Sequence, residues 1–98
     1  VVLKGPGTVV TDAHRLYVNT TGNPALSTAG TGDVLSGVIA SLIAQSMSPF
    51  DAAALGVYLH GLAAALWANQ YGPSGLTASD LAKRLPEAFQ RHRANCGD

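Results

Sequence analysis

The residues best suited to chemistry form the segment 30–33, Gly-Thr-Gly-Asp, which lies between a loop of turn-forming residues at 21–29 and an apolar run at 34–44. A glycine-rich turn that opens into a helix directs backbone N–H groups and the positive end of the helix dipole at one point, where an anion such as phosphate can bind. Phosphate repels a neighbouring carboxylate. Asp33 therefore indicates a chemical task, such as accepting a proton from a hydroxyl or contacting a bound metal ion.

The same segment also has a purely structural interpretation. Asp is favoured near the N-cap of a helix, and Gly-Thr-Gly can be a connection that needs special backbone angles. The P-loop pattern GxxxxGK[ST] is absent from the sequence, and GxGxxG fails because Leu35 stands where the third glycine should be. Spacing alone leaves both interpretations open.

A longer stretch around this segment is more specific. Residues 22–37 read GNPALSTAGTGDVLSG and resemble the NAD(P)H-hydrate dehydratase family, repair enzymes of the ribokinase-like superfamily that use ADP or ATP. Three other segments agree with this resemblance: VLKGPGT at 2–8, GVYLHG at 56–61 and LTASDL at 76–81. The resemblance thus extends over nearly the whole chain.

The resemblance implies an α/β fold, the ribokinase-like three-layer sandwich. Residues 1–98 are expected to be the C-terminal portion of a single domain whose N-terminal half is absent, because the chain opens in a strand signal without a start methionine. Strands are predicted at 1–4, 8–11 and 16–19, the last two forming a hairpin, and three or four helices should follow.

Helical signals begin after the loop. Apolar residues recur at helical spacing over 32–46, and Ser48 followed by proline starts a second helix that extends to about residue 70. Thr77 begins a capping box for the last helix. Pro86 is expected to break or restart that helix and to leave 87–93 as an amphipathic end.

The resemblance also assigns roles at the site. Asp33 would be the catalytic residue and would contact the substrate, while the backbone amides of Gly30, Thr31 and Gly32 hold the transferring phosphate. Further residues implied to bind ADP or phosphate are Lys4, Gly5, Gly7, Thr8, Asn23 and Ala29. For Lys4, the alternative from the residues alone is a surface lysine before a Gly-Pro turn. His60 is interpreted as a hydrogen-bonded core residue rather than a catalyst.

The implied activity is that of an ADP-dependent (S)-NAD(P)H-hydrate dehydratase, in which the hydroxyl of hydrated NADH or NADPH is phosphorylated and then eliminated. Phosphorylation converts hydroxide, a poor leaving group, into a good one. ADP or ATP would be the co-substrate and Mg²⁺ would accompany it. One alternative is a kinase of the same superfamily acting on a vitamin-precursor or sugar alcohol, with Asp33 in the same role. Another is a catalytically silent piece whose small-residue helix serves oligomerisation.

Composition narrows the range of partners. The net charge is zero and no cluster of Lys and Arg marks a nucleic-acid face. Charged residues make up 12% of the chain and apolar residues 47%, so a partner surface, in a homo-oligomer, is expected. A single cysteine, Cys96, fits a reducing cytoplasm. No apolar run is expected to reach the roughly 18 to 20 residues of a membrane span. The family resemblance adds a fused or separate epimerase as a further partner.

Overall fold

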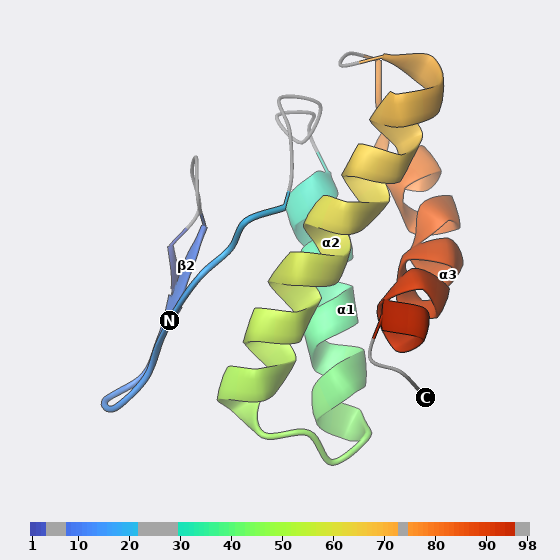
Figure 1. Ribbon diagram of the computed structural model, residues 1–98. Helices are drawn as coiled ribbons and strands as arrows, with labels where there is room; N and C mark the ends of the chain where they lie inside the picture. The colour runs from blue at the N-terminus through green and yellow to red at the C-terminus, as the bar shows by residue number, and fades with distance from the viewer. Residues whose placement is uncertain (4–7, 22–29, 73–74, 96–98) are drawn as a thin grey trace.

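The computed structural model describes residues 1–3, 8–21, 30–72 and 75–95. In chain order the elements are β1 (Val2–Leu3), β2 (Val9–Thr11), β3 (Leu16–Val18), α1 (Thr31–Ala44), α2 (Pro49–Tyr71) and α3 (Ala78–Asn95). A β-hairpin followed by three helices was expected, and both are present (Figure 1). The helix starts at Pro49 and after Thr77 agree with the positions predicted from their capping residues.

The strands form a small antiparallel sheet in the order β1-β2-β3. Val10 lies opposite Val2 on one side and Tyr17 on the other. Val10 faces α2 and is almost fully buried, and its partner Tyr17 shares that face. Because side chains alternate along a strand, the neighbours of Tyr17 in β3, Leu16 and Val18, point to the opposite face and are exposed. One face of the hairpin therefore packs on α2 and the opposite face is apolar and open.

The hairpin turn is closed by Asp12. Its Oδ1 accepts hydrogen bonds from the backbone amides of His14 and Arg15, at 2.8 and 2.7 Å. These bonds lower the pKa of the Asp12 carboxyl, because they favour its charged form. The Arg15 guanidinium lies 4.2 Å from the centre of the Phe50 ring and pairs with Asp51, which joins the turn to the first turn of α2.

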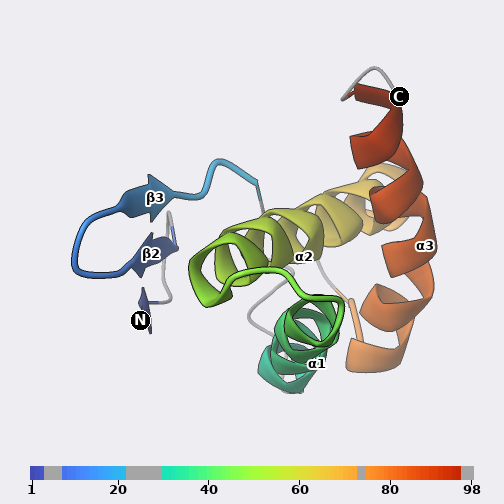
Figure 2. The same ribbon diagram turned by 90° about the horizontal axis from the view of Figure 1, so that it is seen from below.

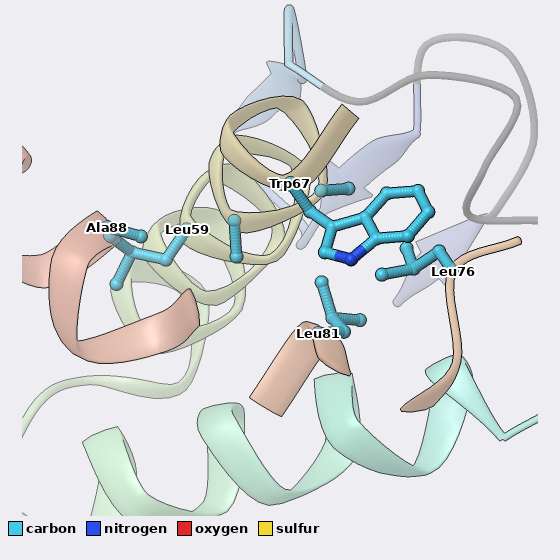
Figure 3. Close-up of a cluster of buried hydrophobic side chains, with 7 residues drawn as sticks. Leu59, Trp67, Leu76, Leu81 and Ala88 are labelled. Carbon is cyan, nitrogen blue, oxygen red and sulfur yellow. The ribbon is translucent and has the colours of Figure 1, made fainter. Parts of the chain in front are cut away.

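The central element is α2, which lies between the sheet and α3, with α1 packed along a further side (Figure 2). Its N-terminus is capped by Ser48, whose Oγ accepts from the Asp51 amide at 3.3 Å. Between α2 and α3, the side chains of Leu59, Trp67, Leu76 and Leu81 form the largest buried cluster (Figure 3).

The α2 helix is more apolar than the sequence analysis expected of any segment of the chain. This 23-residue helix is long and apolar enough to cross a membrane by length and composition, and 56% of its most apolar stretch is buried inside the structure. The expectation that no apolar run reaches the length of a membrane span is therefore wrong. It considered only the run at 34–45, which polar residues interrupt, and not the segment that forms α2. In this structure α2 is the central helix of the core.

The expected break at Pro86 is wrong. The last helix, α3, continues from Ala78 to Asn95 with the proline inside it. Pro86 is itself exposed, while Ala88 is fully buried and Phe89 packs on the core beside it. Proline has no N–H, so one backbone hydrogen bond of α3 is missing at this point. The apolar contacts of the turn after the proline stabilise the helix in its place.

Candidate functional site

The start of α1 has the geometry of an anion-binding turn. Gly30 is the N-cap residue, with φ of 90° and no side chain capping the helix. This left-handed conformation is one that glycine adopts without strain. The Gly30 carbonyl accepts from the amides of Asp33 and Val34, at 3.2 and 3.4 Å. The amide of Gly32 precedes these residues and lies outside the helix's own hydrogen-bond ladder.

Asp33 lies in the first turn of α1 rather than at its cap. Its side chain is exposed, and within the part of the chain that the structure describes it has no ion pair and no side-chain hydrogen bond. Gly30 is also exposed and Gly32 is half-buried. The turn is thus accessible to a ligand, with a carboxylate beside it.

Thr31 differs from its neighbours because it faces the protein interior and is only 5% exposed. Its carbonyl oxygen lies 2.8 Å from Nε2 of His60, which is 7% exposed. The interpretation of His60 as a hydrogen-bonded core residue is therefore confirmed. The sequence did not indicate the partner of His60. The bond joins α2 to the predicted phosphate-binding turn at the start of α1.

In the second segment predicted to bind the nucleotide, residues 4–8, the structure describes only Thr8. Thr8 precedes β2, and its carbonyl accepts from the Asn19 amide at 2.8 Å. Figure 1 shows that β2 and α1 begin at the same end of the molecule. The other predicted nucleotide contacts lie outside the described residues: Lys4, Gly5, Gly7, Asn23 and Ala29.

Two residues missed by the sequence interpretation connect these segments to α2. Asn19 is 7% exposed, and its side-chain amide donates to the Val57 carbonyl at 3.3 Å. The hydroxyl of Thr21 donates to the Tyr58 carbonyl at 2.9 Å. The available signal in the sequence was an asparagine at the end of a predicted strand, directly before a turn-rich loop, because a polar side chain that becomes buried there must find partners.

The remaining features do not add catalytic groups. Among the described residues no cluster of three or more His, Cys, Asp or Glu side chains could hold a metal ion. A hollow of about 520 Å³ lies where α2 ends and α3 begins, and it contains none of the predicted site residues. It is lined by Trp67, Tyr71, Asp80, Lys83 and Arg84.

Known proteins match both the sequence and the fold. The NAD(P)H-hydrate dehydratase family model matches residues 1–87. The chain belongs to the NAD(P)H-hydrate dehydratase family. It is 46% identical over 89 residues to the bifunctional NAD(P)H-hydrate repair enzyme of Hyperthermus butylicus, covering 91% of this chain and 16% of that protein. It is 40% identical over 90 residues to the ADP-dependent (S)-NAD(P)H-hydrate dehydratase of Cenarchaeum symbiosum, covering 92% of this chain and 31% of that protein.

The fold is similar to part of a solved dehydratase structure. The ADP/ATP-dependent NAD(P)H-hydrate dehydratase of Bacillus subtilis, crystallised with ATP and Mg²⁺ and soaked with CoA, superposes with a TM-score of 0.87 at 38% identity. The match covers 92% of this chain and 34% of the Bacillus chain. The chain thus spans between about a sixth and a third of the length of these family members.

Proposed function

We propose that this chain supplies the phosphate-binding turn and the catalytic carboxylate of an ADP- or ATP-dependent (S)-NAD(P)H-hydrate dehydratase. Residues 1–98 would be the C-terminal portion of one ribokinase-like domain, a three-layer sandwich. The names of the Cenarchaeum and Bacillus relatives support the reaction and the nucleotide. The exposed apolar residues Leu16 and Val18 support the larger domain, since further protein would cover that face of the hairpin.

The observation that carries the proposal is the pairing of an exposed Asp33 with an uncapped, accessible turn at the start of α1. The amides at 30–32 and the positive end of the α1 dipole would bind the oxygens of the transferring phosphoryl group. Gly32 has no Cβ, so the phosphate can approach the backbone closely. Lys4 and Thr8 would add contacts to the nucleotide from the segment before β2.

Asp33 would act on the substrate hydroxyl. As the hydroxyl oxygen forms its bond to phosphorus, the Asp33 carboxylate takes the proton and the bond from phosphorus to the nucleotide breaks. Phosphate then leaves with the carbon–oxygen bonding electrons, and loss of the neighbouring proton restores the dihydronicotinamide ring. Mg²⁺ would enter with the nucleotide and neutralise phosphate charge, because the described residues contain no metal-binding cluster of their own.

The test uses the full-length protein that carries this chain. Hydrated NADH is incubated with and without ADP or ATP, and we expect the dihydronicotinamide absorbance band to return only when nucleotide is present. A stable phosphorylated product with no return of the band would assign the protein to the small-molecule kinases instead. No binding of either nucleotide would favour a silent assembly role and would contradict the proposal.

The names of several relatives, among them the Hyperthermus protein, describe bifunctional repair enzymes. This supports a second repair activity, an epimerase fused to the dehydratase or acting beside it, as part of the same proposal. Activity of the full-length protein on both epimers of hydrated NADH would support it.

A further inference from the structure

One turn of α2 is bonded to the chain on both sides of the segment 22–29. On the N-terminal side, Asn19 donates to the carbonyl of Val57 and Thr21 donates to that of Tyr58, at 3.3 and 2.9 Å. A carbonyl oxygen in a helix has a second lone pair beside the one used by the helix bond, so both can accept. The chain entering the segment is thereby held at residues 57 and 58.

On the C-terminal side, the bond comes from His60. The Thr31 carbonyl can only accept, so the Nε2 of His60 carries the proton and donates to it at 2.8 Å. Both residues are at least nine-tenths buried, and little water can compete for this bond. Residues 57–60 of α2 thus hold the chain on both sides of residues 22–29.

The bond to Thr31 also has a directional consequence. The carbonyl of Thr31 and the N–H of Gly32 belong to the same planar trans peptide, in which they point in opposite directions. A donor that fixes the carbonyl toward α2 therefore fixes the Gly32 N–H away from α2. That N–H is one of the amides assigned to the phosphate, and a misplacement of about 1 Å at such a site costs a large part of its effect.

We propose that His60 is a positioning residue for nucleotide binding: through the Thr31 carbonyl it sets the direction of the Gly32 N–H, and Thr21 acts with it on the opposite flank. This inference rests on the proposed function, because it assumes that the amides at 30–32 bind a nucleotide phosphate. His60 does not contact the phosphate. Its effect should appear in nucleotide affinity and KM rather than in proton transfer by Asp33.

The experiment compares His60→Leu with His60→Gln in the full-length protein. Leucine removes the donor, whereas glutamine keeps an N–H at the end of its side chain. Isothermal titration with ADP gives Kd, steady-state kinetics give KM and kcat, and thermal unfolding gives Tm. We expect His60→Leu to raise Kd and KM for the nucleotide about tenfold, with a smaller change in kcat, and His60→Gln to recover most of the affinity.

Leu42→Ala is the matched control, because Leu42 is buried in the last turn of α1, at the opposite end of that helix from the Thr31 bond, so its truncation destabilises the core away from the site. We expect this control to lower Tm but to keep the ADP affinity within about twofold of the wild type. That result would show that general destabilisation does not by itself weaken nucleotide binding. Equal ADP affinity for His60→Leu and the wild type would overturn the inference. So would an equal loss of affinity in Leu42→Ala.

If His60→Leu does not fold, Thr21→Val tests the same inference on the other flank. Valine has the shape of threonine but no hydroxyl, and we expect its ADP Kd to rise about threefold to tenfold, with Thr20→Val as an exposed control nearby. Wild-type affinity in Thr21→Val would then contradict the inference. A wild-type protein that binds neither ADP nor ATP would instead contradict the proposed function, so the two failures are distinguishable.

Discussion

A Cβ added to Gly56 would lie 2.7 Å from Cγ1 of Ile39, so these two residues set how closely α1 approaches α2. Glycine permits this close approach because it has no Cβ. Because α1 carries the phosphate-binding turn at its N-terminus and α2 carries His60, this crossing also sets the spacing between the two parts of the site.

The first prediction concerns this crossing. Gly56→Ala should lower the free energy of unfolding by about 1–3 kcal/mol, because Ile39 is branched at Cβ and has little freedom to move aside. Chemical denaturation of the full-length protein measures the change. Gly37→Ala is the matched control, since no atom lies within 4 Å of its added Cβ. This variant should gain about 0.5–1 kcal/mol from helix propensity, and an equal loss in both variants would contradict the packing argument.

The second prediction concerns the phosphate-binding turn. Gly32→Val should raise the ADP Kd by about tenfold or more, because its side chain would stand where the phosphate meets the backbone. Gly32 is inside α1 and does not have a positive φ, so its backbone conformation is one that other residues also adopt. Titration calorimetry and circular dichroism measure binding and folding separately. ADP affinity equal to that of the wild type would place the phosphate elsewhere.

The third prediction separates catalysis from binding at Asp33. Asp33→Asn should lower kcat by about 10²–10⁴, the usual contribution of a positioned proton acceptor. The ADP Kd should stay the same or fall, because the substitution removes a negative charge beside the phosphate. Single-turnover kinetics and titration with ADP measure the two effects. A variant that keeps its kcat would show that Asp33 only stabilises the start of the helix.

The fourth prediction concerns stability at high pH. Burial, and then the neighbouring Tyr58, raise the pKa of Tyr17 above its usual 10.0, and the Tyr17 hydroxyl donates to Asn19 Oδ1 at 2.8 Å. Since the folded-state pKa is the higher one, this contribution is fully present below pH 10 and is lost as the pH rises through the raised pKa. Denaturation between pH 9 and 11 should show falling stability. Tyr17→Phe should flatten that slope, and an unchanged slope would contradict the assignment.

Much of the local structure follows from the sequence because its signals act over a few residues. Ser48 and Thr77 start helices through bonds to the amides of Asp51 and Asp80, each three residues ahead. The Gly-Thr-Gly-Asp segment likewise indicated a helix start with an accessible carboxylate, and the structure has both. The family membership also depended on short motifs that can be found without any tertiary contact.

Tertiary packing decided the features that join distant parts of the chain. Pro86 stays within α3 because buried side chains beyond it hold the helix together, a contribution that no local preference contains. His60 was identified from sequence only as a core histidine, since its bond to Thr31 spans 29 residues and depends on how α1 and α2 pack. The sequence alone determined which groups could do chemistry here. The packing of α2 decided which of them are held together, because hydrogen bonds between distant residues form only after the core has set their positions.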